Sequence, residues 1–302
     1  MLGVWSDFTT ANQPQPFADF MAPSPVDVIE FHLWHDSFIN MAWSPAIGTG
    51  ATNKGDEILA FRDAAPNRWI HWNVPLTTSA EPSLADAASG LRDSRYSQAA
   101  NNILATNGGT DQPIICRVAW EHNAEWFPWK AITATEKASF VTAWRRLVDC
   151  FRAVSPRFRF EWCPNVPGGQ VHSPEGTWPG DDYVDLVSCD MYYMAEWNNG
   201  DGVAHFNYIR DAAWGLNHLA DMAASKGKPM TIAEWGVMAE YPTAPGVEVD
   251  QSAYIDAMAD WIASRKLLYH VYWDSNSAFK GRLSNGQYPL TAARFKQRFA
   301  HP

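Results

Sequence analysis

The stretch "PIICRVAWE" (residues 113–121), followed after a loop by "TATEKASFVTAWRRLVDCFRA" (residues 133–153), decides the fold class. The first segment is apolar without clean alternation, which is typical of a strand buried on both faces of a parallel sheet. The second segment begins with Thr133 and Glu136 at the spacing of a capping box. It continues with an apolar stripe at helical spacing, formed by Phe140, Trp144, Leu147, Val148 and Phe151. The two segments therefore predict one unit of a strand followed by a helix.

The same unit recurs along the whole chain of 302 residues. Apolar runs rich in β-formers predict strands at 2–7, 27–34, 68–76, 113–121, 159–165, 185–193, 229–237 and 268–275. Apolar stripes predict further helices at 204–224, 252–264 and 289–300, with weaker patterns at 14–22, 54–64 and 84–105. Long loops are expected at 35–53, between 165 and 185, and at 238–250.

Eight strands alternating with helices predict an α/β fold, a single (β/α)8 TIM barrel that forms one catalytic domain over residues 1–302. A doubly wound open sheet is the alternative. No glycine-rich dinucleotide or phosphate-binding fingerprint follows the first strand, which speaks against that alternative. We expect no cofactor.

Composition narrows the classes of partner. The net charge of −10 argues against binding to nucleic acid, which needs a basic surface. No apolar run approaches the ~18 residues of a membrane span, so no membrane partner is expected. The four cysteines lack metal-binding spacing and are predicted to be mostly buried, reduced thiols. The N-terminus does not read as a signal peptide, so the chain is either cytoplasmic or the mature form of a secreted or periplasmic protein; we expect a monomer.

The predicted strands end in an unusual set of residues. Nearly every one ends in Trp, His, Tyr or a carboxylate, and the chain contains 16 Trp. Active sites of (β/α)8 barrels lie at the C-terminal ends of the strands. Glu121 ends the fourth predicted strand and Glu234 the seventh, and barrel closure would bring both to one rim. Paired carboxylates across a cleft are the machinery of glycoside hydrolysis, whereas the histidines lack the spacing of a metal site.

Three segments carry a family resemblance. "RVAWEHNAEWFPW" (117–129) resembles the acid/base segment of glycoside hydrolase family 26, the β-mannanases and related endoglycanases within the large clan of (β/α)8 retaining glycosidases. "KPMTIAEWG" (228–236) is similar to the nucleophile segment of that family, and "PGDDYVDLVSCDMYY" (179–193) is similar to the run into its sixth strand. The chain departs from the family pattern at Trp120, where His is usual, and at Ala124, where Gly is usual.

The resemblance implies a role for several residues. Glu121 becomes the acid/base, Glu234 the nucleophile and Tyr192 the hydrogen-bond partner that keeps the nucleophile ionised. Trp126 and Trp129 become walls that stack on sugars near the cleavage point, and Trp273 the floor beneath the attacked sugar. Further candidates for substrate contact at or near the strand ends are Asn123, Trp34, His71, Trp72, Asn165, Trp235 and Arg117.

Several of these residues have a structural alternative. Trp34 and Trp72 could be barrel packing, His71 a core histidine, and Arg117 a structural and electrostatic support. Two other glutamates are assigned structural roles: Glu125 is expected on the solvated rim, and Glu161 in a buried ion pair or in a contact between layers.

The expected function is that of a retaining endo-β-glycanase that cleaves a polysaccharide by a two-glutamate double displacement. The candidate substrates are β-mannan or glucomannan and a bacterial exopolysaccharide backbone; Trp120 weakens the case for mannan. A carbohydrate-binding barrel without catalytic activity is the alternative.

Overall fold

The computed structural model describes residues 1–9, 13–108, 110–166 and 171–300. Its strands all lie in one parallel sheet, in the hydrogen-bonded order β6-β5-β4-β3-β2-β1-β9-β8-β7. They are β1 (Leu2–Trp5), β2 (Val28–His32), β3 (Trp69–Val74), β4 (Ile114–Val118), β5 (Phe158–Trp162), β6 (Leu186–Val187), β7 (Asp190–Met194), β8 (Ile232–Met238) and β9 (His270–Tyr272).

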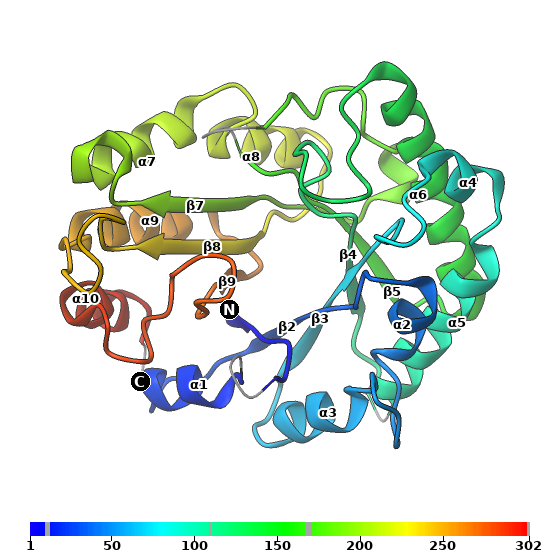
Figure 1. The fold of residues 1–302 in the computed structure, drawn as a ribbon, viewed down its shortest axis with the longest axis horizontal. Helices are drawn as coiled ribbons and strands as arrows, with labels where there is room; N and C mark the ends of the chain where they lie inside the picture. Colours follow the sequence, from blue (N-terminus) through cyan, green and yellow to red (C-terminus); the bar gives the residue numbers. More distant parts are fainter. Residues whose placement is uncertain (10–12, 109, 167–170, 301–302) are drawn as a thin grey trace.

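The sheet curls into a barrel, and helices surround it (Figure 1). The sixth predicted strand is present as two pieces, β6 and β7, which are separated by Ser188 and Cys189. Single parallel bridges join Asn165 to Asp190 and Val187 to Met230, so each piece reaches the strand on its far side. This closes the ring, and the predicted (β/α)8 barrel is confirmed.

The helices are α1 (Gln15–Met21), α2 (Phe38–Trp43), α3 (Gly55–Asp63), α4 (Leu84–Ser89), α5 (Asp93–Thr106), α6 (Ala134–Val154), α7 (Gly202–Asp211), α8 (Leu216–Ser225), α9 (Ser252–Arg265) and α10 (Pro289–Phe299). The capping box at the start of α6 is present, because Thr133 accepts from the Glu136 backbone and the Glu136 side chain returns the bond.

Three predictions, two about helices and one about a loop, were wrong in detail. The helix expected at 84–105 is broken at Gly90, which takes a left-handed φ of 95° and ends α4. The helix expected at 204–224 is broken before Gly215, where Trp214 has a φ of 62°. The expected loop at 35–53 contains α2, which Ser37 caps by accepting from the Asn40 backbone. Part of the loop expected between 165 and 185 lies outside the described residues.

Charged side chains are buried in the barrel rather than confined to its surface. Glu30, Arg117, Glu161 and Asp190 are all fully buried. A buried charge without a partner costs several kcal/mol, so each of these groups needs a partner inside the barrel. Their pairing organises the candidate site.

Two expectations from composition can be compared with the structure. The four cysteines are free thiols, and all except Cys150 are buried. Among the described residues, no helix has both the length and the apolar character that a membrane span requires.

Candidate active site

Glu121 lies three residues beyond the end of β4, in a backbone conformation that is rare for glutamate. Its φ is 51°, and that of Ala119 is 44°. Left-handed conformations of residues other than glycine cost of order 1–3 kcal/mol and persist where the surroundings enforce them. The Glu121 backbone N–H donates to the Cys163 carbonyl oxygen, at 2.9 Å, which ties this turn to the segment after β5.

Two donors hold the Glu121 carboxyl group. The Trp126 indole N–H donates to Oε2 at 2.6 Å, and the Asn165 side-chain amide donates to Oε1. Glu121 as a whole is 7% exposed. Burial, helped by the negative charge of Glu234, raises the pKa of Glu121 to about 7. A proton donor with that pKa is suited to general acid catalysis near neutrality.

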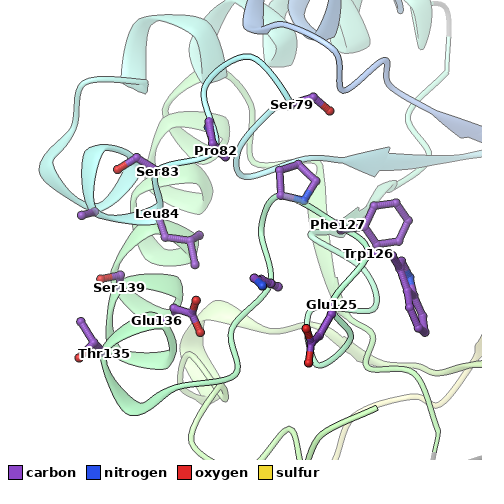
Figure 2. Close-up of a pocket in the computed structure, with 13 residues that line it drawn as sticks. Ser79, Pro82, Ser83, Leu84, Glu125, Trp126, Phe127, Thr135, Glu136 and Ser139 are labelled. Carbon is purple, nitrogen blue, oxygen red and sulfur yellow. The ribbon is translucent and has the colours of Figure 1, made fainter. Parts of the chain in front are cut away.

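Trp126 is 51% exposed and is one of the residues that line a pocket beside the loop after β4 (Figure 2). Because its indole N–H is engaged by Glu121, the ring is held in a fixed orientation. This placement suits the predicted contact with a sugar.

Glu234 lies within β8 and is 4% exposed. Tyr192, on the adjacent strand β7, donates its hydroxyl to Oε2, while Arg117 donates to Oε1. The His32 Nε2 atom lies 3.2 Å from Oε1. Burial alone would raise the pKa of Glu234, but the charge of Arg117 and the hydrogen bond from His32 hold it well below its usual range. Glu234 is therefore poised as an ionised carboxylate.

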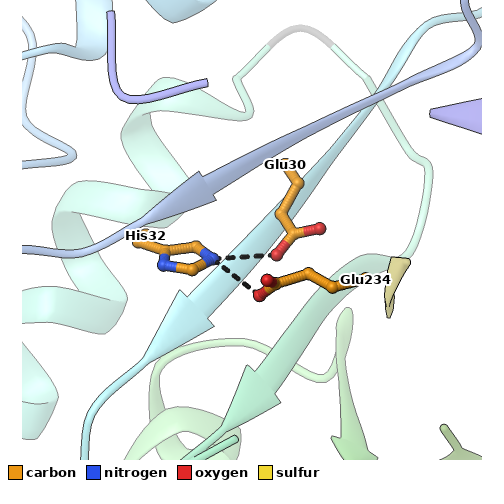
Figure 3. Close-up of side chains that lie close together, drawn as sticks. All are labelled: Glu30, His32 and Glu234. Atoms are coloured by element: carbon orange, nitrogen blue, oxygen red, sulfur yellow. Dashed lines mark hydrogen bonds and ion pairs between the residues drawn. The ribbon is translucent and has the colours of Figure 1, made fainter. Parts of the chain in front are cut away.

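Glu30 and His32 on β2 complete the surroundings of Glu234 (Figure 3). The same His32 nitrogen lies 2.9 Å from Glu30 Oε1. Burial would lower the pKa of His32, but hydrogen bonds to Glu234 and Glu30 raise it and favour the imidazolium. Neither Glu30 nor His32 was among the candidate site residues that the sequence indicated. The sequence could have indicated that Glu30 and His32 lie together, because residues two apart on a strand share a face.

The ligand atoms of Glu30, His32 and Glu234 lie within 4.8 Å of one another, close enough to share a metal ion. The middle of this group is already occupied by the Arg117 Nη2 atom. That nitrogen donates to Glu30 Oε1 at 2.7 Å and to Glu234 Oε1, and it lies 3.1 Å from His32 Nε2. The guanidinium therefore takes the place that a cation would need.

Arg117 is the centre of the buried charges. It also donates to Asp190 and to the Asn73 side-chain oxygen, and it has no exposed surface. Burial, with the neighbouring charges of Glu234 and Glu121, holds the pKa of Asp190 well above its usual range despite Arg117. Arg117, predicted among the sugar contacts, therefore lies beneath Glu234 with no exposed surface.

Trp120 packs against His32 and Arg117 and is 1% exposed. Its ring centroid lies 4.6 Å from that of His32 and 4.5 Å from that of Trp129. The chain thus has Trp at the position where the resemblance leads one to expect His, and a histidine from β2 reaches Glu234.

Five more predicted contacts are buried and offer a sugar no surface. Trp72, Trp129 and Trp235 are 0% exposed, and His71 and Asn123 are 1% exposed. Trp129 donates to the Trp120 carbonyl oxygen, and Asn123 donates to the Asn165 carbonyl oxygen, so both act as supports of the loop. We therefore assign these residues to packing and support.

His71 belongs to a second buried cluster deeper in the barrel. Its Nε2 atom lies 2.6 Å from Glu161, which also accepts hydrogen bonds from Thr231 and Tyr269. Burial lowers the pKa of His71, but the charge of Glu161 and the hydrogen bonds to Glu161 and Glu30 together raise the pKa to about 9. The structure thus contains the buried ion pair that was expected for Glu161.

The remaining predicted contacts are closer to solvent. Trp273 is 6% exposed and stacks on Trp5, with ring centroids 4.1 Å apart. Trp34 and Asn165 are partly exposed. Glu125 stands on the rim, where it forms an ion pair with His172 at 3.1 Å.

Comparisons with known proteins agree with the fold. Among solved structures, the chain is similar to a modular endo-β-1,4-mannanase from Cellulomonas fimi, with a TM-score of 0.70 and 19% identity over 100% of this chain and 70% of that one. It is also similar to a GH26 β-mannanase from Bacteroides ovatus, with a TM-score of 0.67 and 15% identity over 98% of this chain and 87% of that one. At these identities the likeness shows the fold alone.

Two curated relatives match part of the sequence. The mannan endo-1,4-β-mannosidase of Bifidobacterium adolescentis is 29% identical over 182 residues, which is 55% of this chain and 18% of that protein. Endoglucanase H of Acetivibrio thermocellus is 27% identical over 170 residues, which is 51% of this chain and 17% of that protein. The match thus spans less than a fifth of either relative. The profile of glycosyl hydrolase family 26 matches residues 58–272, and the chain belongs to that family.

Proposed function

We propose that this chain is a retaining endo-β-glycanase that hydrolyses internal β-glycosidic bonds of a polysaccharide, with Glu234 as nucleophile and Glu121 as acid/base. The observation that carries the proposal is the opposed ionisation of the two carboxyl groups. The pKa of Glu121 is raised to about 7, and that of Glu234 is held well below its usual range. Two titratable groups with pKa values pushed apart in this way mark an acid and a nucleophile.

In the first step, a carboxylate oxygen of Glu234 attacks the anomeric carbon and forms a covalent bond to it. The bond from that carbon to the glycosidic oxygen breaks, and the electron pair stays on the oxygen. Glu121 gives its proton to this oxygen, so the leaving chain departs as an alcohol. Arg117 and Tyr192, which bind the two oxygens of Glu234, hold the carboxylate in place for attack.

In the second step, Glu121 is a carboxylate and accepts a proton from water. The oxygen of that water attacks the same anomeric carbon, and the bond to Glu234 breaks. Glu234 regains its negative charge and Glu121 its proton. Two inversions give net retention of configuration.

A carbohydrate-binding barrel without catalysis would not need this arrangement. Holding Glu121 buried and protonated beside an ionised Glu234 costs free energy that binding alone does not require. The backbone strain at Glu121 adds to that cost.

β-Mannan or glucomannan is the first candidate substrate, since curated relatives include a mannan endo-1,4-β-mannosidase and an endoglucanase. Trp120, in place of the usual family His, keeps a bacterial exopolysaccharide backbone as the second candidate. The protein would encounter such a polysaccharide outside the cell or in a periplasm.

Release of reducing sugar from a panel of β-linked polysaccharides tests the proposal. The wild-type chain should release reducing ends from at least one polymer, and Glu121→Gln should not. Glu234→Ala should lose activity on both polymer and activated aryl glycoside. Wild-type rates from Glu234→Ala would refute the assignment, and monosaccharide as the sole early product would refute endo action.

A further inference from the structure

The loop between β9 and α10 places an aromatic side chain, Phe279, against the hydrogen-bond partner of the proposed nucleophile. The Phe279 ring centroid lies 4.7 Å from that of Tyr192, and Phe279 is 8% exposed. Tyr192 in turn donates its hydroxyl to Glu234 Oε2. Phe279 is therefore separated from the proposed nucleophile by a single side chain.

Gly236 on β8 makes room for this contact. It lies two residues after Glu234, on the same face of the strand, and it is paired in register with Tyr192 on β7. A Cβ atom at this position would lie 3.2 Å from the Phe279 ring, 3.3 Å from the Tyr192 ring and 3.4 Å from the Cβ atom of Trp273. A glycine here thus lets both rings pack directly on the strand that carries Glu234.

Hydrogen bonds hold the loop on both sides of Phe279. Asp274, which is 4% exposed, accepts from the backbone N–H of Leu283 at 2.8 Å and of Ser284 at 3.0 Å. This closes residues 274–284 into a loop. The Trp273 indole N–H donates to the Phe279 carbonyl oxygen at 3.3 Å. The backbone that carries the Phe279 ring is therefore tied to the end of β9.

Tyr192 depends on its neighbours to stay aimed at Glu234. Burial and the charge of Glu234 hold the pKa of the Tyr192 hydroxyl well above its usual range, so the hydroxyl stays protonated and able to donate. A hydrogen bond weakens steeply when its donor moves out of line, so the ring must be held. Trp273 packs edge-on against it with ring centroids 6.2 Å apart, and Phe279 lies nearer, at 4.7 Å.

We propose that Phe279 is a positioning residue for Glu234: its ring holds Tyr192 so that the phenol hydroxyl stays on the carboxylate during attack. The proposal rests on the proposed endo-glycanase function and adds a residue that acts through Tyr192 without touching the sugar. It follows that Phe279 affects the rate of attack only while residue 192 carries its hydroxyl.

A double-mutant cycle of Phe279→Ala and Tyr192→Phe tests this dependence. The substrate is the dinitrophenyl β-glycoside of mannobiose, or of the disaccharide of whichever polymer the screen identifies, and kcat/KM reports the attack by Glu234. Phe279→Ala should lower kcat/KM by about tenfold in the wild type and by less than about twofold when Tyr192→Phe is already present. Equal losses in both backgrounds, or no loss in the wild type, would overturn the proposal.

Two further variants guard against an effect on folding alone. Phe299→Ala is the matched control, because Phe299 is also 8% exposed but packs on Trp235 from α10. It should lower the urea midpoint and leave kcat/KM within about twofold of wild type. Phe279→Leu keeps apolar bulk and replaces Phe279→Ala in the cycle if the alanine variant does not fold; it should lower kcat/KM by about threefold, again only with Tyr192 in place.

A binding measurement separates positioning from contact with the substrate. In a Glu234→Ala background, calorimetric titration with β-mannohexaose, or with the hexasaccharide of the polymer identified, should give the same affinity with and without Phe279→Ala. Weaker binding would make Phe279 a sugar contact and overturn the proposal. An active wild type with an additive cycle would remove this role alone, whereas a wild type inactive on every polymer and aryl glycoside would remove the proposed function, and this role with it.

Discussion

The guanidinium of Arg117 donates a hydrogen bond to the carboxylate of Glu234 from beneath, inside the barrel. The same nitrogen bonds Glu30, and the side chain has no contact with solvent. One buried cation thus contacts carboxyl groups from three strands and fixes the proposed nucleophile among them.

Arg117→Met should destabilise the protein by about 3–5 kcal/mol, because removing one partner leaves buried carboxylates uncompensated. Urea denaturation measures the change. The control Arg95→Met, at a partly exposed arginine of α5 that bonds Gln98, should cost less than about 1 kcal/mol.

A double variant isolates the cause. Adding Glu30→Gln to Arg117→Met removes one of the stranded negative charges, so part of the lost stability should return. A double variant no more stable than Arg117→Met would mean that packing, and not charge balance, sets the cost.

The pH profile should carry the signature of Glu121. Because its pKa is raised to about 7, kcat/KM should fall as pH rises through about 7 and the acid loses its proton. The charge of Glu234 contributes to that raised value, so Glu234→Gln should lower the pKa of Glu121. NMR titration of 13C-labelled glutamate follows this shift in the inactive variant.

Glu125→Gln is the control for that experiment, since Glu125 lies on the same loop but on the exposed rim. It should leave the alkaline limb of the profile in place. If Glu234→Gln left the Glu121 titration unmoved, the electrostatic coupling of the pair would be disproved.

Stability should depend on pH through His71. Its pKa is raised from 6.5 to about 9, so the folded state binds a proton more tightly than the unfolded state. This contribution is fully present below about pH 6.5 and is lost as pH rises through about 9; it is of order 3 kcal/mol. Urea denaturation near pH 6 and near pH 10 should show the loss in the wild type.

His71→Gln should be less stable near pH 6 and should show a smaller fall between the two pH values. The control His218→Gln, at an exposed histidine of α8 that packs on Trp214, should keep the wild-type fall. If His71→Gln lost as much unfolding free energy between the two pH values as the wild type does, the pH dependence would belong to another group.

The periodic part of the structure was predictable from the sequence. All eight predicted strands are present, because long apolar runs buried on both faces leave a strong signal, and their closure brought Glu121 and Glu234 to one site. The breaks in the helices were missed because they depend on backbone conformation at Gly90 and Trp214.

The assignment of tryptophans to the cleft went wrong where the strand pleat was ignored. Glu234 faces the interior, so its neighbour Trp235 must face the helices, where it packs on Phe295 and Phe299. The pairing of Arg117 with Glu30 and Asp190 was beyond reach, because it joins residues 87 and 73 positions apart across the barrel.

Trp120→His, which restores the usual family residue, should not improve activity on mannan. Trp120 is buried against His32, Trp129 and Phe127, so the smaller imidazole would leave a cavity and a buried polar group. A loss of about 2–4 kcal/mol in unfolding free energy is expected, against little change for the exposed Trp43→His. Because His32 already reaches Glu234, a second histidine supplies no missing donor. A gain in kcat/KM on β-mannan would show instead that position 120 sets the substrate.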